Sequence, residues 1–145
     1  MRQELRKVVL PGLEALGFGG KGLHFKRRRE EALDLLDFQY WKYGGEFILE
    51  FAHRERGDLT TSWGDVVPEE KITAAHIPPL MRARLEQRGT LTGEHLRGFV
   101  FAAFGEDRVK YESLAREVAS LLQQVDEWLR TGKVGSHVHV LGAAA

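Results

Sequence analysis

The stretch LDLLDFQYWKYGGEFILEFAH, residues 33–53, contains two apolar segments separated by a turn with two adjacent glycines. Large apolar side chains alternate with smaller or polar ones in its second half, where Glu50 occupies one of the intervening positions. The first half alternates similarly and places Asp37 and Gln39 on one side. This period of two is typical of half-buried strands, and Gly44-Gly45 tolerates the positive φ angles of a hairpin turn. The stretch therefore predicts paired antiparallel strands with one core face and one face carrying isolated polar groups.

Further elements are predicted on both sides of this pair, whose strands cover residues 33–41 and 46–53. A glycine-rich connection leads into another strand at residues 23–29, and the apolar residues 99–104 are compatible with a fourth strand. Before them, the spacing of leucines and valines from Leu5 to Leu16 predicts a helix that Pro11 kinks or restarts.

The most regular helical pattern covers residues 107–131, where apolar side chains recur every three or four positions. Prolines predict short helices starting at Pro68 and covering residues 80–88. We therefore expect an α+β fold: an antiparallel sheet of about four strands, an N-terminal helix, short middle helices and a long C-terminal helix packed on one face. Residues 1–133 are predicted to form a single domain, and residues 134–145 a C-terminal tail or edge strand.

The composition excludes several kinds of protein. The chain has 145 residues, no cysteine, and 21 basic against 21 acidic side chains. Without cysteine it has no disulfide framework, thiolate metal site or cysteine nucleophile. Its apolar runs are shorter than a signal-peptide core or a membrane span requires, so we expect a cytoplasmic protein without a membrane partner.

Short motifs from residue 5 to about residue 130 resemble a known family. They are Leu16-Gly17-Phe18 followed by Lys21-Gly22, His24-Phe25-Lys26-Arg27-Arg28, Leu36-Asp37-Phe38-Gln39 before Glu46-Phe47-Ile48-Leu49, and His76-Ile77 with Arg82-Ala83-Arg84-Leu85. Together they resemble the bacterial domain-of-unknown-function family 4304, whose "LGF..KG..F.R" opening leads to a strand ending in "NFQ". Asp37 stands where that pattern has asparagine. The resemblance implies a compact α+β domain and assigns no activity.

The basic run Lys26–Arg29 is a candidate anion-binding segment. Residues 1–29 contain eight basic and two acidic side chains, whereas residues 30–58 contain eight acidic and three basic ones. Alternate side chains of a strand point to opposite faces, so Lys26 and Arg28 are the pair that could contact phosphates together. The acidic segment favours cross-strand ion pairing instead, and nucleic-acid binding is therefore the least favoured function.

Histidines and carboxylates supply the candidates for chemistry. His24, Asp37 and Glu50 are the best acid–base candidates because they are predicted on the polar face of the sheet, near Gln39. His137 and His139 would share one side of an extended chain and are weak metal candidates. The pattern supplies no third ligand at a diagnostic spacing, so no cofactor or metal is expected.

Aromatic residues give the favoured functional hypothesis. Tyr40, Trp41 and Tyr43 cluster at the end of the predicted strand 33–41, beside Lys42. Exposed Tyr and Trp side chains are common in protein interfaces. We therefore expect a non-enzymatic protein-interaction or binding module whose partner is another protein or a second copy of the chain. The alternatives are a small enzyme or ligand-binding protein that uses the polar face, and nucleic-acid binding through the basic strand.

Overall fold

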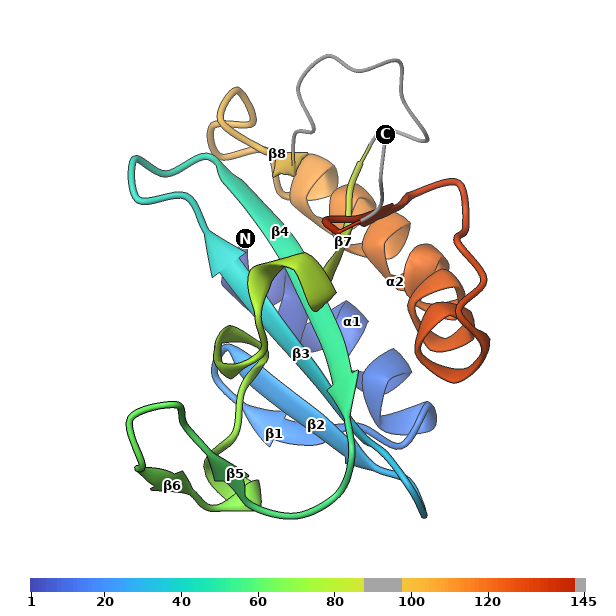
Figure 1. Cartoon of the computed structure of the whole chain (residues 1–145). Helices are drawn as coiled ribbons and strands as arrows, with labels where there is room; N and C mark the ends of the chain where they lie inside the picture. Colours follow the sequence, from blue (N-terminus) through green and yellow to red (C-terminus); the bar gives the residue numbers. More distant parts are fainter. Residues whose placement is uncertain (88–97, 143–145) are drawn as a thin grey trace.

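The computed structural model describes residues 1–87 and 98–142, in which two α-helices pack on one antiparallel sheet (Figure 1). Helix α1 spans Arg2–Ala15 and helix α2 spans Arg108–Thr131. Both helices contribute side chains to the same core against the sheet. The predicted α+β class, with an N-terminal and a C-terminal helix, is thus confirmed. The predicted sheet of about four strands is wrong, because the sheet contains seven strands within the described residues alone.

Six strands follow one another in the order β1-β2-β3-β4-β7-β9, and β8 pairs with the start of β4. Their bounds are β1 Gly19–Lys21, β2 His24–Arg28, β3 Leu33–Tyr40, β4 Glu46–Arg54, β7 Ala83–Leu85, β8 Phe99–Val100 and β9 Val138–Val140. A separate two-stranded ribbon and three short 3-10 helices connect β4 to β7. These are β5 Leu59–Thr60, β6 Val66–Val67, η1 Glu69–Lys71, η2 Ala74–His76 and η3 Pro79–Met81.

The additional strands are short and depend on pairing with distant segments. β1 lies inside the predicted glycine-rich connection and pairs with β2. β7 lies within residues 80–88, where a helix was predicted; only η3 forms there before the chain extends along β4, and residue 88 is outside the described part. β9 in turn pairs with β7, at the end of the sheet. Local periodicity cannot reveal three-residue strands whose backbone partners lie far away in the sequence.

Two other predicted elements are shorter or more continuous than expected. Only Phe99–Val100 of the predicted strand at residues 99–104 pairs with β4. The sequence of residues 90–98 predicts a linker within the domain, and all of it except residue 98 lies outside the described part. Helix α1 continues through Pro11 and does not restart there. Helix α2 has the predicted extent: Asp107 caps it by accepting hydrogen bonds from the N–H groups of Val109 and Lys110.

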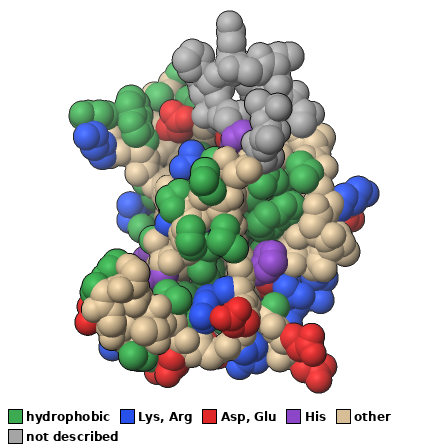
Figure 2. All heavy atoms as spheres, viewed as in Figure 1, with side chains coloured by type: hydrophobic (Ala, Val, Ile, Leu, Met, Phe, Trp, Pro, Cys, Tyr) green, Lys and Arg blue, Asp and Glu red, His purple; other side chains and the backbone are tan. Residues whose placement is uncertain are grey.

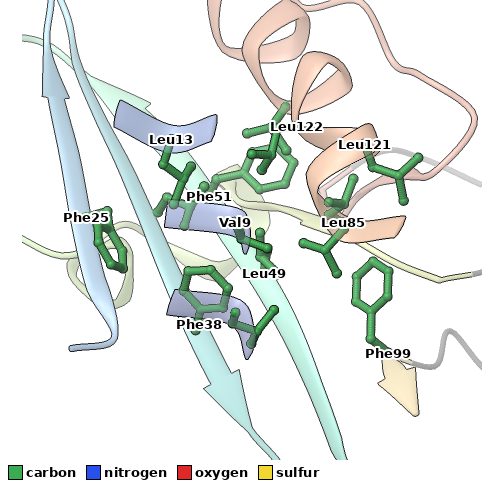
Figure 3. Close-up of a cluster of buried hydrophobic side chains, with 14 of the residues drawn as sticks. Val9, Leu13, Phe25, Phe38, Leu49, Phe51, Leu85, Phe99, Leu121 and Leu122 are labelled. Carbon is green, nitrogen blue, oxygen red and sulfur yellow. The ribbon is translucent and has the colours of Figure 1, made fainter. Parts of the chain in front are cut away.

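The main core lies between the two helices and the sheet (Figure 3). Val9 and Leu13 from α1 and Leu121 and Leu122 from α2 meet large apolar side chains of the strands. These strand residues are Phe25, Phe38, Leu49, Phe51, Leu85 and Phe99. The alternation predicted for residues 46–53 therefore selects the face that packs on the helices.

The opposite side of the sheet, called the outer face below, is partly covered. A second apolar cluster joins strand residues to the segment that contains η1 and η2. Its members are Leu33, Leu35, Ala52, Ile72, Ala74 and Ile77. The cluster covers one part of the outer face. Polar side chains lie on the same face towards the β3–β4 turn.

Candidate functional site

A row of polar residues crosses the outer face at one level. Consecutive pairs are direct cross-strand partners from β2 through β3, β4 and β7 to β9. The row consists of His24, Asp37, Glu50, Arg84 and His139. Directly opposed residues in antiparallel strands point to the same side, so all five belong to the outer face. We call this set the polar row.

Two of the predicted acid–base candidates contact each other at one end of the polar row. The Nδ1 atom of His24 lies 2.9 Å from Oδ1 of Asp37. The Asp37 side chain is only 3% exposed, whereas that of His24 is 57% exposed. A carboxylate at Nδ1 orients the imidazole and leaves Nε2 as its open nitrogen. This pair has the geometry of an oriented histidine that could exchange a proton with a bound molecule.

The third acid–base candidate, Glu50, occupies the next position of the polar row and is engaged by two arginines. Its carboxylate oxygens accept hydrogen bonds from Nη1 of Arg82 and Nε of Arg84, each at 2.9 Å. Glu50 is fully buried, and the two guanidinium groups compensate its charge. Arg82 also donates to the carbonyls of Ala75 and Ile77, so it attaches the η2 segment to the sheet. This arrangement gives Glu50 a structural role.

Sequence reasoning did not assign Arg82 and Arg84 to the site. Their separation by one residue was a usable signal, because such residues share a face once a segment is extended. The predicted helix at residues 80–88 hid that signal. Glu86 lies two residues beyond Arg84 and is also buried. Burial raises its pKa to about 7, and the charge of Arg84 opposes this effect.

The basic run of β2 is divided between the two faces of the sheet. Arg27 is buried on the helix side, where its Nε donates to Asp34 at 2.7 Å and its Nη1 donates to Asp126 of α2. Arg29 also donates to Asp34, through Nε and Nη2. The prediction that acids of residues 30–58 neutralise the run is confirmed for these two arginines. The network joins β2 and β3 to α2.

The predicted anion candidates Lys26 and Arg28 both contact Glu69 of η1. Arg28 donates to the Glu69 carboxylate at 3.0 Å, and Lys26 Nζ donates to its backbone carbonyl at 2.7 Å. Arg56 and the Gly57 N–H also donate to this carboxylate. These hydrogen bonds, those of Arg56 first, hold the pKa of Glu69 at about 2. Burial and the neighbouring charge of Arg28 lower the pKa of Lys26.

A hollow of about 500 Å³ lies beside these residues. Its basic side chains are Lys21, His24, Lys26 and Arg28. Glu70 and Thr73 also line it, so the hollow is not uniformly positive. His24 thus lines the same hollow as Lys21 and Lys26, which supply positive charge. The hollow could hold a small anion close to the imidazole.

The predicted aromatic cluster separates into one packed and two exposed side chains. Tyr40 packs on Phe47, with ring centroids 5.6 Å apart. Trp41 and Tyr43 are 55% and 72% exposed, and their rings meet edge to face at 5.1 Å. Lys42 lies over the Tyr43 ring at 5.0 Å from its centroid. We call residues 41–43 the hairpin tip, because they form the first part of the turn, residues 41–45, between β3 and β4.

The hairpin tip adjoins a second hollow on the outer face. This hollow is about 470 Å³ and is lined by Trp41, Gln39 and Ile48, with Arg84 of the polar row on its border. Figure 2 views this face and shows hydrophobic side chains at the hairpin tip and again over η2 and η3. In η3, Leu80 and Met81 are 71% and 61% exposed. The outer face therefore combines separate apolar groups with polar side chains between them.

The weak metal candidates His137 and His139 lie just before β9 and within it. His139 lies opposite Arg84 in the register of β9 and β7. His137 precedes β9, and its Nδ1 lies 3.1 Å from the hydroxyl of Ser136 and 3.4 Å from the side-chain nitrogen of Gln124. Within residues 1–87 and 98–142, no group of three His, Asp or Glu side chains is arranged to hold a metal ion.

The fold and the outer face define a small α+β domain with a polar row and an exposed aromatic turn. Over the described residues, no helix is both long and apolar enough to cross a membrane. The family described as "Domain of unknown function (DUF4304)" matches residues 9–131. The chain belongs to this family, as the sequence motifs predicted. No curated protein and no solved structure matches the chain.

Proposed function

We propose that the protein is a binding module that docks another protein on its outer face, with the hairpin tip as the anchor. The observation that carries this proposal is the edge-to-face pair of Trp41 and Tyr43, both more than half exposed. Large aromatic side chains provide much of the binding energy of protein interfaces because they bury a large area with few rotatable bonds.

The hairpin tip is held in place before any partner binds. The Trp41 N–H donates to the carbonyl of Glu46, and the Gly44 N–H donates to the carbonyl of Trp41, both at 2.9 Å. Below the tip, Tyr40 is paired with Phe47 in the ladder. A rigid anchor loses little conformational freedom on binding, which favours affinity.

The surroundings of the hairpin tip indicate the chemistry of the partner. The adjoining hollow could accept an apolar side chain between Trp41 and Ile48. Lys42 and Arg84 line the same hollow, whereas its acid, Glu46, accepts a hydrogen bond from the Gly98 N–H. A matching surface would therefore present an apolar side chain next to a carboxylate.

The proposal is tested by photo-cross-linking in the native host with p-benzoylphenylalanine in place of Tyr43. We expect one defined adduct, identified by mass spectrometry, that disappears when Trp41→Ala is added. Trp63 is the matched control, since it is 75% exposed in the turn between β5 and β6. The same probe at Trp63 should not give that adduct. An adduct unaffected by Trp41→Ala, or no adduct from Tyr43, would contradict the proposal.

Light scattering decides whether the partner is a second copy. A dimer that forms with rising protein concentration and is lost in Trp41→Ala, but not in Trp63→Ala, would identify self-association. A monomer at all concentrations would direct the search to a different protein.

The contact between His24 and Asp37 supports a second candidate function, an enzyme that acts on a small anion. Asp37 would orient His24 as a general base, and Lys21 and Lys26 would attract the anionic substrate into the hollow beside it. Screening the purified protein against phosphate and carboxylate esters tests this alternative. Hydrolysis abolished by His24→Gln, with the Tyr43 cross-link unchanged, would favour it over the interaction module.

Nucleic-acid binding receives the least support from the contacts of β2. Arg28 is paired with Glu69, and Lys26 contacts the same residue. A binding titration with DNA and RNA provides the test. Affinity that falls steeply with added salt, and falls further in Lys26→Gln, would revive this function.

A further inference from the structure

A pocket on the helix side of the sheet is separate from the outer face and from the surface that we propose docks a protein. It lies between the first turns of α1 and the β1–β2 hairpin and has a volume of about 330 Å³. This volume is in the range of ordinary small-molecule sites, which begin at about 300 Å³. The pocket is lined by Arg2, Leu5, Arg6, Leu10, Gly20, Lys21, Gly22, Leu23, Phe25, Phe38 and Tyr40.

The inner part of this pocket is apolar and preformed. Phe25 and Phe38 are buried, and their rings meet edge to face with centroids 5.8 Å apart. Leu5 of α1 is also buried, whereas Leu10 and Leu23 are half-buried and leave apolar surface towards the pocket. These side chains belong to the main core or pack against it, so the floor of the pocket is a rigid part of the fold. An apolar tail bound there would leave water without disturbing the core.

The border of the pocket is positively charged. Arg2 and Arg6 are four residues apart in α1 and therefore lie on one side of the helix. Lys21, at the end of β1, lines this pocket and also the hollow beside His24, its partner in the β1–β2 ladder. All three side chains are exposed, and none of them forms an ion pair with a described residue. The Arg2 guanidinium lies 4.4 Å from the centroid of the Tyr40 ring, which places its charge above the apolar wall. None of the residues that line the pocket is acidic.

We propose that this pocket binds a small amphipathic carboxylate, with its apolar tail over Phe25 and Phe38 and its carboxylate between Arg2 and Arg6. The apolar floor alone would accept any hydrophobic molecule of suitable size. Two arginines without an acidic neighbour in the lining select an anion, because arginine forms charge-assisted hydrogen bonds with a carboxylate. The proposal is independent of the proposed protein-binding function, which uses the other face of the sheet.

Isothermal titration calorimetry of the full chain with octanoate, below the concentration at which octanoate forms micelles, tests the proposal. We expect saturable 1:1 binding. Octan-1-ol and butyrate should each bind at least about tenfold more weakly, since the first lacks the charge and the second lacks most of the tail. The double variant Arg2→Gln, Arg6→Gln should weaken octanoate binding by about tenfold or more.

Lys7→Gln is the matched control, because Lys7 follows Arg6 in α1, is exposed and does not line the pocket. Octanoate affinity should be unchanged in this variant. Two-dimensional NMR locates the ligand: the ring signals of Phe25 and Phe38 should shift, while those of Trp63 should not.

Three results of the titrations would each overturn the proposal. They are the absence of saturable octanoate binding, equal affinity for octan-1-ol and octanoate, and equal loss of affinity in Lys7→Gln and the double variant. Shifts confined to Trp41 and Tyr43 would also overturn it, because they would place the ligand at the hairpin tip.

Discussion

The exposed imidazole of His24 and the buried carboxyl of Asp37 meet across strands β2 and β3, with 2.9 Å between Nδ1 and Oδ1. Among the described side chains, His24 is the only hydrogen-bond partner of this carboxyl. The contact therefore gives the buried Asp37 carboxyl a hydrogen-bond partner. It also orients the His24 imidazole for proton transfer.

A double-mutant cycle measures the strength of this contact. We expect His24→Ala and Asp37→Ala to show a coupling free energy of about 1 kcal/mol in urea unfolding, because each variant removes the same hydrogen bond. His53→Ala is the control, since His53 is an exposed histidine whose ladder partner is Asp34 and not Asp37. Its coupling to Asp37→Ala should be below about 0.5 kcal/mol. Equal coupling in the two cycles would show that the His24 contact contributes nothing specific.

The folded protein should need at least one of the two arginines, Arg82 or Arg84, to compensate the buried charge of Glu50. Removing Arg84 alone leaves the hydrogen bond from Arg82, which also holds the carbonyls of Ala75 and Ile77. Arg84→Ala should therefore lower the free energy of unfolding less than Arg82→Ala. The double variant leaves a buried charge unpaired and should cost about 3 kcal/mol or more.

Arg116→Ala provides the comparison for the Glu50 variants. Arg116 forms an exposed ion pair with Glu112, one turn away on α2. Such a pair contributes about 0.5 kcal/mol or less. Denaturant unfolding of the four variants gives all the values. A double variant at Arg82 and Arg84 that is as stable as Arg116→Ala would refute the structural role of Glu50.

Stability at low pH should depend on Glu69. Hydrogen bonds from Arg56, Gly57 and Arg28 lower its pKa from 4.5 to about 2 in the folded protein. The unfolded state then binds more protons between these values, so this contribution is complete above pH 4.5 and is lost as the pH falls towards 2. In Glu69→Gln, the free energy of unfolding should therefore change less with pH between about 2 and 4.5 than in the wild type.

Glu70→Gln is the control for Glu69, because Glu70 is the exposed neighbour in the same 3-10 helix. The free energy of unfolding of Glu70→Gln should depend on pH in the same way as that of the wild type. Urea unfolding at a series of pH values from 2 to 6 measures both variants. A Glu69→Gln curve parallel to that of the wild type would contradict the assignment.

Glu86 should have the opposite effect at higher pH. Burial raises its pKa from 4.5 to about 7, so the folded protein holds this proton more tightly than the unfolded chain. The stabilisation is present below pH 4.5 and is lost as the pH rises through 7. Glu86→Gln should remove this loss, whereas Glu106→Gln, at an exposed position, should retain it. The measurement is the change in Tm between pH 5 and pH 8 for the wild type, Glu86→Gln and Glu106→Gln. An equal change in all three proteins would exclude Glu86 as the cause.

The sequence predicted those parts of the site that depend on strand alternation. The pattern of residues 33–53 placed Asp37 and Glu50 on one face, and they are direct partners in the β3–β4 ladder. It also separated the core residues from the polar ones, because a half-buried strand repeats every two residues. The contact of His24 with Asp37 additionally required the register of β2, which the separate strand patterns did not specify.

The partners of Glu50 and Glu69 were not predictable in the same way. Arg82 and Arg84 reach Glu50 because the chain pairs β7 with β4 after a connection that contains η1, η2 and η3. Glu69 meets Arg28 and Arg56 through the same connection. Such contacts depend on the path of a segment without regular periodicity, and no local pattern encodes that path.

By itself, the sequence determined the α+β class, the two helices and the central pair β3 and β4. These helices and strands are long enough for their hydrophobic residues to repeat several times with the period of a helix or a strand. The tertiary structure alone decided the pairing of β1, β7, β8 and β9 and the cover on part of the outer face. These features consist of two- or three-residue strands and loop contacts whose stability comes from partners distant in the chain. The candidate surfaces on the outer face combine both: local alternation places their side chains, and segments that only the assembled fold brings together enclose them.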